Sequence, residues 1–245
     1  CLICESSGTW AIAIGEKGVL WIRMKATGTS GHASYGQGES AINKVLAAIG
    51  AISEMHGTNG YPSQDVATLI RQQKSIVEEK WGPGTGERAG IITVNVGTVH
   101  GGGQVNLIPD ASEAEIDLRV PPGITTEDVK RDIDRRLAQL ALTDIDIEIF
   151  NRCDPYVTSP DEGLVGLLQK HALKVCGSKA LPVVRLGSTD GRFFRREGIP
   201  TAIYGPAVHN MGGPDESIGE DELFAVAEVY ARVILDYLGG DRSDG

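Results

Sequence analysis

The sequence is poor in the features that mark secreted, membrane-spanning or zinc-finger proteins. Only 5% of its 245 residues are aromatic, and it has no run of about 18 apolar residues of the kind that crosses a bilayer. Its four cysteines are Cys1, Cys4, Cys153 and Cys176. They are too few for a disulfide framework and lack paired zinc-finger spacing, which suits a reducing compartment. We therefore expect a globular protein of the cytoplasm.

Basic residues are also scarce. Lysine and arginine number 23 against 33 aspartates and glutamates, which gives a formal net charge of -10. Binding to nucleic acid or to an anionic membrane requires a basic face that displaces counterions, so we expect neither partner. The 41% of hydrophobic residues is enough to form the core of one large domain or of two ordinary ones.

The chain lacks an initiator methionine and a signal peptide. It opens with CLICESSG, as though it began inside a strand. We expect a fragment or a processed product, in which N-terminal targeting information would not be visible.

The clearest periodic patterns lie between Val19 and Phe150. Alternating apolar residues predict strands, and apolar residues at helical spacing predict helices. The expected strands are Val19–Ala26, Gly90–Val99, Asp110–Val120 and Ile145–Ile149; the expected helices run from Glu39 to His56 and from Thr125 or Thr126 to Leu140. This order is typical of a ferredoxin-like βαββαβ fold, with two helices on one face of a four-stranded antiparallel sheet.

Two segments have weaker patterns. Residues 58–88 mix glycine, proline and charges, and they predict a long loop with a short helix near Val66–Gln73. Trp10–Ile14 predicts a strand, and Gly15–Gly18 after it is a hairpin or turn signal.

The residues after Phe150 have the pattern of an α/β layer. Ser159 is expected to cap a helix that runs to Cys176, Ala180–Arg185 and Pro200–Tyr204 read as buried strands, and a last helix runs from Glu220 to its stop at Gly239-Gly240. Residues 1–15 are expected to belong to the same layer. The predicted organisation is therefore a catalytic-type segment at 1–15, a ferredoxin-like insertion at 16–151, and the rest of the α/β domain at 152–245.

Reactive side chains concentrate in Gly187–Glu216, near the end of the predicted strand Pro200–Tyr204. His209 follows this strand, and Asp215 and Glu216 follow His209. Loops that leave the carboxyl ends of strands bind ligands in open α/β sheets, so His209 is a candidate for metal or proton chemistry. The alternative is a surface histidine that binds nothing.

Six segments in order resemble one enzyme family. They are CESSG, GEKGVLWIRMKATGTSGHAS, NLIPDASEAEIDLRVPPG, GSTDGRFF, GIPTAIYGP and HNMGGPDESI. The family is that of the metal-dependent amidohydrolases that include acetylornithine deacetylase, succinyl-diaminopimelate desuccinylase, aminoacylase and glutamate-releasing carboxypeptidase. The resemblance implies an α/β catalytic domain that holds two zinc ions, interrupted by a ferredoxin-like lid through which the protein forms a homodimer.

The resemblance also implies metal ligands. Glu5 matches a glutamate that binds one metal ion, and His209 matches the last metal-binding histidine. A carboxylate and an imidazole are suitable zinc ligands. Ser6 stands where the family usually has proline, and the gap between His209 and Asp215-Glu216 is longer than in many members.

Further site residues are implied in the same way. His32 matches a lid histidine that reaches across the dimer and hydrogen-bonds the oxygen on which negative charge develops. Its alternative is a solvated histidine in a Gly-rich loop. Asn106 and Arg119 match positions that bind the carboxylate or amide of the substrate, and Gly187 and Ser188 match a substrate site formed by backbone and hydroxyl groups.

Three of the charged residues have structural interpretations. Arg119 alternates with Glu115 and Asp117 on the wet face of the sheet, and it could simply pair across strands. Asp190 and Arg192 are expected to brace the Gly187 loop through an ion pair.

The family also uses a His-x-Asp pair, a bridging aspartate and a Glu-Glu pair, which precede the Glu5 motif and are not in this sequence. We therefore predict that the parent protein hydrolyses an amide bond in an N-acyl amino acid or small peptide, and that this chain alone is inactive and holds zinc poorly. Its STDGRF segment is more similar to the desuccinylase form than to the aminoacylase form.

Two other functions remain open from the sequence. The chain could be a non-catalytic dimerisation or scaffolding protein derived from the family. It could also be a regulatory small-molecule-binding domain, although this leaves the GSTDGRFF and HNMGGPDE segments unexplained.

Overall fold

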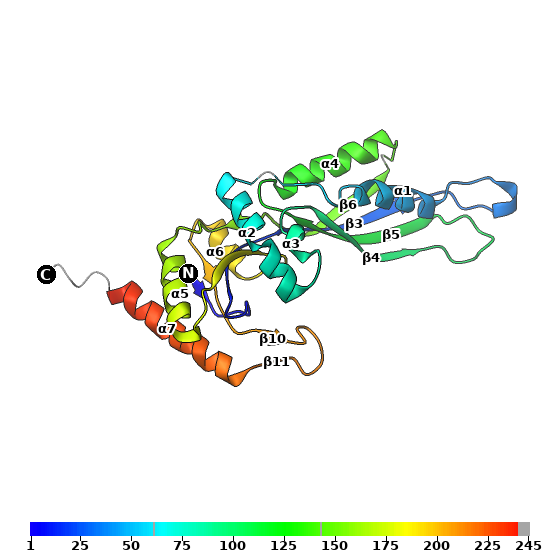
Figure 1. The fold of residues 1–245 in the computed structure, drawn as a ribbon. Helices are drawn as coiled ribbons and strands as arrows, with labels where there is room; N and C mark the ends of the chain where they lie inside the picture. Colours follow the sequence, from blue (N-terminus) through cyan, green and yellow to red (C-terminus); the bar gives the residue numbers. More distant parts are fainter. Residues whose placement is uncertain (61, 143, 240–245) are drawn as a thin grey trace. The chain divides into compact units, whose positions relative to one another are not determined.

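A computed structural model describes residues 1–60, 62–142 and 144–239 (Figure 1). The chain divides into two compact units. Unit 1 comprises Cys1–Glu16, Ser63–Ala89 and Tyr156–Gly245, and unit 2 comprises Lys17–Pro62 and Gly90–Pro155. The sequence assigned residues 63–89 to the insertion, whereas they fold with unit 1.

Unit 2 has the predicted ferredoxin-like fold. Its sheet has the strand order β4-β5-β3-β6, formed by β3 (Gly18–Thr27), β4 (Thr93–Gly101), β5 (Ala111–Val120) and β6 (Ile145–Cys153), and every neighbouring pair is antiparallel. Helices α1 (Ala41–Ser53) and α4 (Thr126–Gln139) supply the two helical elements. The mixed α/β architecture expected from the sequence is thus confirmed.

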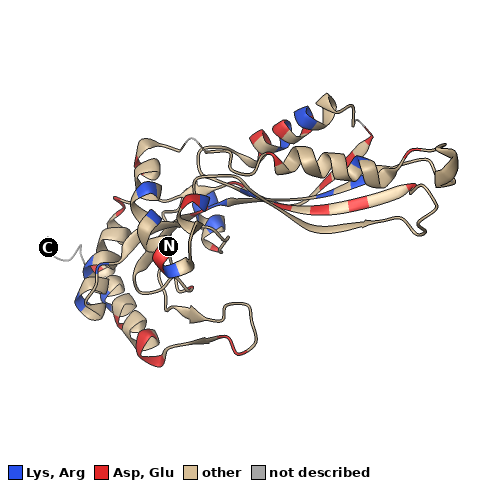
Figure 2. Ribbon diagram, turned by 45° about the vertical axis from the view of Figure 1, so that its right-hand side comes forward, with Lys and Arg blue, Asp and Glu red and all other residues tan. Residues whose placement is uncertain are grey.

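The alternation along β3 and β5 explains this unit. Leu20, Ile22 and Met24 are buried on β3, and Ala114, Ile116 and Leu118 are buried on β5, while the residues that alternate with them are more exposed. One face of the sheet therefore forms an apolar core with the helices, and the other carries charged residues, visible along the strands in Figure 2.

Side-chain caps define where both helices of unit 2 begin. Ser40 Oγ accepts from Asn43 N at the start of α1, and Thr125 forms a capping box with Asp128 at the start of α4. Hydrogen bonds from Thr125 lower the pKa of Asp128 to about 2. Thr125 is thus the cap, and Thr126, the other candidate, is the first residue of the helix.

Unit 1 is built on a small mixed sheet. Its strands are β1 (Leu2–Ile3), β2 (Ala11–Glu16), β7 (Tyr156–Val157), β8 (Leu181–Arg185) and β9 (Ala202–Ile203). The order is β1-β9-β2-β7, with β8 also paired to β2 in parallel. Helices α5 (Gly163–Cys176) and α7 (Glu220–Gly239) pack together, and their apolar residues form a core with β2, β8 and β9.

Several predicted details of unit 1 are wrong. Gly15–Gly18 is not a hairpin, because β2 pairs within unit 1 while β3 pairs with β5 and β6 of unit 2. Helix α5 begins at Gly163, and its N-cap residue Glu162 makes no capping hydrogen bond. Helix α7 reaches Gly239, and the stop expected at Gly240 lies outside the described residues. None of the described helices has the length and apolarity needed to span a bilayer.

The prediction of a long loop at 58–88 is wrong, although the short helix expected near Val66–Gln73 lies within a longer helix. Residues Gln64–Trp81 form α2, an 18-residue helix capped by Ser63, and Thr85–Arg88 form α3. The buried residues of α2 are Leu69, Gln73 and Val77. These positions are four residues apart and include a glutamine, so the apolar stripe is too narrow to stand out from the charged residues around it.

Candidate active site

Glu5 follows β1 in a turn that unit 1 holds closely. The hydroxyl of Ser7 accepts a hydrogen bond from Gly205 N at 3.0 Å and donates to Ala11 O at 2.9 Å. A Cβ on Gly205 would lie 2.3 Å from the carbonyl oxygen of Glu5, so only glycine fits there. The Glu5 carboxylate lies 3.7 Å from Nη1 of Arg185 on β8.

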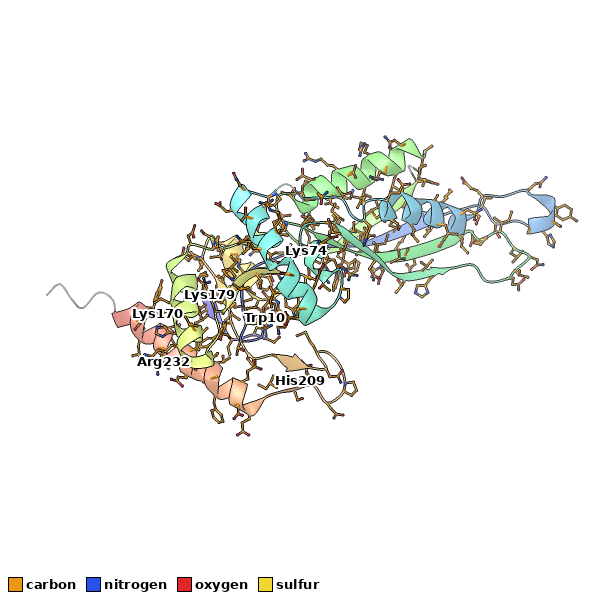
Figure 3. The ribbon with its side chains drawn as sticks, in the orientation of Figure 1. Trp10, Lys74, Lys170, Lys179, His209 and Arg232 are labelled. Atoms are coloured by element: carbon orange, nitrogen blue, oxygen red, sulfur yellow. The ribbon has the colours of Figure 1, made fainter. Side chains whose placement is uncertain are left out.

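His209 lies on a short hairpin and not in a free loop. It is the second residue of β10 (Val208–His209), which pairs antiparallel with β11 (Ser217–Ile218), and its side chain is exposed (Figure 3). The loop between the strands is braced internally, because Gly212 N donates to the Glu216 carboxylate at 3.1 Å. Glu216 thus has a local structural role in the described chain.

One cavity gathers the segments around the predicted unit 1 residues. Its volume is about 820 Å³, and its walls include Ser6, next to Glu5, as well as Val208, next to His209, and Gly187. Three segments that are far apart in the sequence therefore converge on one hollow of unit 1. Glu5 and His209 themselves are not part of its lining.

The metal-binding donors in the described residues do not make a zinc site by themselves. No group of three or more His, Cys, Asp or Glu side chains is clustered in the described parts of the chain. Zinc in proteins takes three or four protein ligands, and Glu5 and His209 offer two donors, of which Glu5 lies beside the cation of Arg185. These two side chains are suitable zinc ligands, but two are too few to hold the ion.

The Gly187–Thr189 loop is held by a buried acid. The carboxylate of Glu16, at the end of β2, accepts from Thr189 N at 2.5 Å and from Thr189 Oγ1 at 2.6 Å. Gly187, the lining residue, has no heavy atom within 4 Å of a Cβ built on it, so the space around it is open. Ser188, the other predicted substrate residue, lies between Gly187 and the anchored Thr189.

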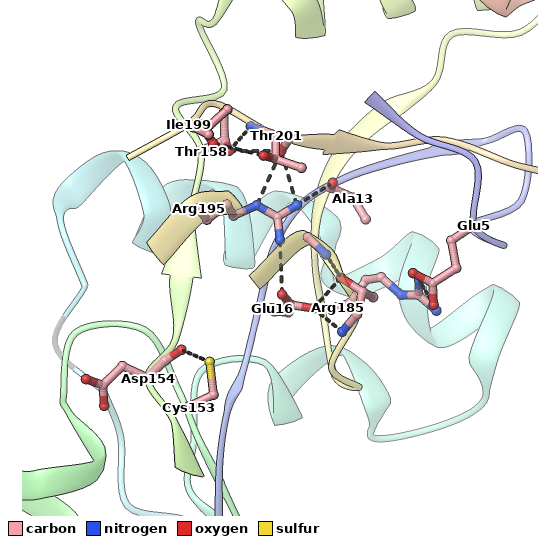
Figure 4. Close-up of polar contacts among 12 residues, drawn as sticks. Glu5, Ala13, Glu16, Cys153, Asp154, Thr158, Arg185, Arg195, Ile199 and Thr201 are labelled. Carbon is pink, nitrogen blue, oxygen red and sulfur yellow. Dashed lines mark hydrogen bonds and ion pairs between the residues drawn. The ribbon is translucent and has the colours of Figure 1, made fainter. Parts of the chain in front are cut away.

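A buried arginine completes this anchor. Arg195, on α6 (Gly191–Arg196), pairs with Glu16 at 3.2 Å and donates to the carbonyl oxygens of Ala13 and Thr201, both at 3.1 Å (Figure 4). The side chain of Glu16 is only 2% exposed and that of Arg195 only 3%. Burial raises the pKa of Glu16, while the hydrogen bonds from Thr189 and the charge of Arg195 oppose this rise.

The expected Asp190–Arg192 brace is wrong. No ion pair joins these residues in the described chain, and Arg192 instead lies over the ring of Phe193, 4.8 Å from its centroid. The pair that does the bracing, Glu16 and Arg195, is separated by 179 residues. No local sequence pattern could have identified it.

In unit 2, the structure brings His32 and Asn106 together. His32 pairs with Leu107 in an isolated antiparallel bridge, and Ala33 N donates to Asn106 O at 2.9 Å. A Cβ on Gly31 would lie 2.0 Å from Gln37 O, so glycine permits the tight path of this loop. Both predicted residues therefore lie at one end of the unit.

The imidazole of His32 has a defined local partner. Its Nδ1 accepts from Ser34 N at 3.3 Å and lies 2.8 Å from Ser34 Oγ, at the start of η1 (Ala33–Tyr35). With Nδ1 as an acceptor, the neutral ring carries its proton on Nε2. The exposed ring can then donate a hydrogen bond outward through Nε2.

Arg119 is placed differently. Its guanidinium binds Asp117 through Nε at 2.8 Å and Nη2 at 3.0 Å, and it lies over the ring of Trp21 at 6.0 Å. The structure thus pairs Arg119 with a carboxylate of its own strand, β5, and the expected pairing across strands stays a prediction. A substrate role for Arg119 stays a prediction.

Arg119 also lies far from His32 within unit 2. Arg119 is opposite Val19 near the start of β3, whereas Ala111 is opposite Thr27 at its end, the end from which the chain continues to His32. The rise along β5 from Ala111 to Arg119 is roughly 26 Å at about 3.3 Å per residue. His32 and Arg119 therefore occupy opposite ends of the sheet.

The comparisons with known proteins agree with this architecture. Residues 14–144 match the M20 peptidase dimerisation domain. The succinyl-diaminopimelate desuccinylase of Helicobacter pylori is 24% identical over 233 residues, which is 94% of this chain and 53% of that protein. The chain thus spans about half the length of the curated relatives it matches.

Solved structures share the fold. An M20 family metallo-carboxypeptidase from Sulfolobus solfataricus superposes with a TM-score of 0.76 at 18% identity, covering 95% of this chain and 62% of that one. A tripeptidase from Staphylococcus aureus gives a TM-score of 0.69 at 19% identity, covering 94% of this chain and 54% of its own. With the match to residues 14–144, these findings show that the chain belongs to the M20 family of metallopeptidases and amidohydrolases.

Proposed function

We propose that this chain supplies the dimerisation domain and part of the catalytic domain of a zinc-dependent enzyme that hydrolyses an amide bond in an N-acyl amino acid or a small peptide. The observation that carries the proposal is the convergence of the segments next to Glu5, Gly187 and His209 on one cavity of unit 1. The names of the relatives, a desuccinylase, a carboxypeptidase and a tripeptidase, all denote cleavage of such bonds in those proteins.

Glu5 and His209 are proposed to be the metal ligands that this chain contributes. Because two donors do not suffice for zinc, the remaining ligands must come from outside the described residues. The chain by itself is therefore expected to bind zinc weakly and to be inactive.

Substrate binding and orientation are proposed for Gly187, Ser188, His32 and Asn106. Gly187 and Ser188 contact it through backbone and hydroxyl groups, on a loop fixed by Glu16. His32 donates from Nε2 to the oxygen that gains negative charge, and its Ser34 contact fixes the ring orientation. Asn106, held beside the His32 loop, offers an amide to the same substrate.

A homodimer is part of the proposal. His32 and Arg119 lie at opposite ends of one sheet, so two copies allow residues from both ends to serve one site. The edge strand β4, TVNVGTVHG, has no acidic or basic residue apart from His100, whereas the other edge, β6, carries Asp146 and Glu148. An uncharged edge is suited to pairing with another strand, so β4 is the proposed dimer edge.

Two measurements on the purified chain test this function. The zinc content should be well below one ion per chain after dialysis, and hydrolysis of N-acyl amino acids should be absent. In a full-length protein that contains this chain, His32→Ala should reduce turnover while the dimer remains intact by analytical ultracentrifugation. Turnover by the isolated chain would contradict the proposal that its metal site is incomplete.

A non-catalytic dimerisation protein is the second candidate, and the match of residues 14–144 to a peptidase dimerisation domain favours it. The full-length His209→Ala variant separates the two functions. The enzyme loses turnover on this change, whereas a scaffold has no turnover to lose and keeps its dimer. The cytoplasmic location stays a prediction.

A further inference from the structure

The helix α2 is fixed to unit 1 by its one buried polar side chain. Gln73 donates from Nε2 to Val184 O at 3.1 Å and accepts from Val184 N at 2.8 Å. The glutamine amide thus binds the backbone of β8 as a neighbouring strand would, and Leu69 packs into the unit 1 core. This attachment sets the position of the whole helix, including its last residue, Trp81.

Trp81 meets Trp10, which comes from the turn after Glu5. Their ring centroids are 5.4 Å apart with an interplanar angle of 64°, an edge-to-face contact. Both rings line the cavity of about 820 Å³ that also includes Gly187. A segment of the chain that lies within the matched dimerisation domain therefore supplies an aromatic wall to the cavity of unit 1.

The same cavity contains a cation with an unused hydrogen-bond donor. Arg185 lines it, its side chain is 13% exposed, and its Nη1 is buried without a hydrogen-bond partner. Glu5 is 3.7 Å from this nitrogen, beyond hydrogen-bond distance. The other acid of the lining, Glu222, is occupied by Thr9 Oγ1 at 3.1 Å and Ala207 N at 2.9 Å.

The Glu5 carboxylate is an ion-pair partner of Arg185 but leaves this nitrogen without a hydrogen bond. A buried guanidinium nitrogen that makes no hydrogen bond is costly, and a carboxylate within hydrogen-bond distance is the group that matches it. Two indole rings offer apolar and edge-to-face contacts to another ring. The volume is within the range of ligand pockets and exceeds what a single small acid would fill. The cavity therefore suits a ligand that combines an aromatic group with a carboxylate.

We propose that this cavity is a specificity pocket, in which Trp10 and Trp81 bind an aromatic group of the substrate and Arg185 binds its carboxylate. The proposal rests on the proposed function, because it identifies the substrates as N-acyl amino acids that carry a ring. Trp81 and Arg185 are specificity-determining residues in it. Arg119, which binds Asp117, does not supply the cation in this pocket.

Calorimetric titration of the whole chain tests the pocket without requiring turnover. The probes are hippurate, which has both ring and carboxylate, N-benzoylglycinamide, which lacks the carboxylate, and N-acetylglycine, which lacks the ring. Hippurate should bind at least about tenfold more tightly than either, as expected for a hydrogen bond to a charged group or for burial of a ring.

Variants assign this preference to residues. Trp81→Ala should weaken the affinity for hippurate by about tenfold or more and leave the affinity for N-acetylglycine unchanged, since it removes only the ring contact. Arg185→Met should weaken the affinity for hippurate by a similar factor and leave the affinity for N-benzoylglycinamide unchanged. Phe224→Ala, which removes an exposed ring of α7 outside the cavity lining, is the matched control and should change nothing. Circular dichroism melts check that each variant is folded.

Three results would overturn the proposal. They are equal affinity for hippurate and N-acetylglycine, an unchanged affinity in the folded Trp81→Ala chain, and a loss of the carboxylate preference in Arg119→Met but not in Arg185→Met. The titration measures binding and not hydrolysis, so a failure of the pocket proposal can be distinguished from a failure of the proposed function. If hippurate binds tightly and the full-length protein hydrolyses no amide, the pocket proposal stands and the proposed enzymatic function is wrong.

Discussion

The two units differ in where they keep their charged groups. In unit 2, Arg23 lies on the wet face of the sheet and pairs with Glu115 at 2.7 Å and Glu148 at 3.0 Å, while the opposite face is an apolar core. In unit 1, Glu16 and Arg195 are buried beside the candidate site loop. The comparison indicates that unit 2 is ordered by its hydrophobic pattern, and that the site loop of unit 1 is ordered by a buried polar network.

The largest expected effect comes from breaking the buried pair. Glu16→Ala leaves Arg195 buried without its carboxylate and frees both Thr189 donors, so unit 1 should lose about 3–5 kcal/mol of unfolding free energy. Urea titration followed by the fluorescence of Trp10 and Trp81 in a Trp21→Phe background measures this loss.

The double variant Glu16→Met/Arg195→Met is the matched control. Replacing both charges by apolar groups removes the isolated charge, so it should lose much less than Glu16→Ala. An equal loss in the two would mean that the site loop does not depend on the pairing, and the contrast between the units would fail.

The second effect tests the apolar core of unit 2. Ile116 on β5 is 1% exposed, and Ile116→Ala should cost about 2–5 kcal/mol because it removes buried methyl groups and leaves a cavity. Urea unfolding followed by Trp21 fluorescence, in a chain with Trp10→Phe and Trp81→Phe, reports on this unit. Ile116→Val, which removes one methylene, should cost about 1 kcal/mol, and a larger cost for Val than for Ala would contradict the core packing.

These differences explain what the sequence could and could not predict. Ile116 and Leu118 alternate with charged neighbours, and this local pattern alone identifies a strand and its buried face. The strands of unit 2 were therefore predicted close to their observed limits. Only a short part of the helix α2, near Val66–Gln73, was predicted, because Gln73 occupies a position on its buried face. Its burial depends on Val184 of β8, which no local window includes.

The site shows the same division. Residues that belong to motifs, such as Glu5, His32 and His209, could be named from the sequence, and the structure shows their local surroundings. The bond from Thr189 to Glu16 spans 173 residues, and the contact of Trp10 with Trp81 depends on where α2 docks. Anchors and cavity walls of this kind are tertiary features, which local periodicity does not encode.

A third prediction concerns the cap of α4. Thr125→Ala removes the side-chain bonds of the capping box and should cost unit 2 about 1 kcal/mol at neutral pH. The pKa of Asp128 is lowered to about 2 from 3.8, so its stabilising contribution is present above pH 3.8 and is lost as the pH falls through about 2.

Acid titration of the unfolding free energy checks this sign. The difference between the wild-type chain and Asp128→Asn should shrink as the pH falls from 3.8 toward about 2. A difference that grows on acidification would show that the capping carboxylate does not keep its lowered pKa in the folded unit.

The smallest effect is expected at Arg23, and it is the one that sharpens the comparison. Arg23 makes two ion pairs and lies over the ring of Phe150 at 5.2 Å, whereas one ion pair is described for Arg195, so by ion pairs alone Arg23 would be expected to contribute more. Its side chain is 31% exposed, however, and water and salt screen exposed charges. Arg23→Gln should therefore lower the free energy of unfolding by little more than Lys25→Gln, a substitution at an exposed position of the same strand. The small difference between the two variants should vanish as the salt concentration is raised. A loss as large as that of Glu16→Ala, unaffected by salt, would show that the charged groups of both units order their folds in the same way, and burial would no longer explain the difference between them.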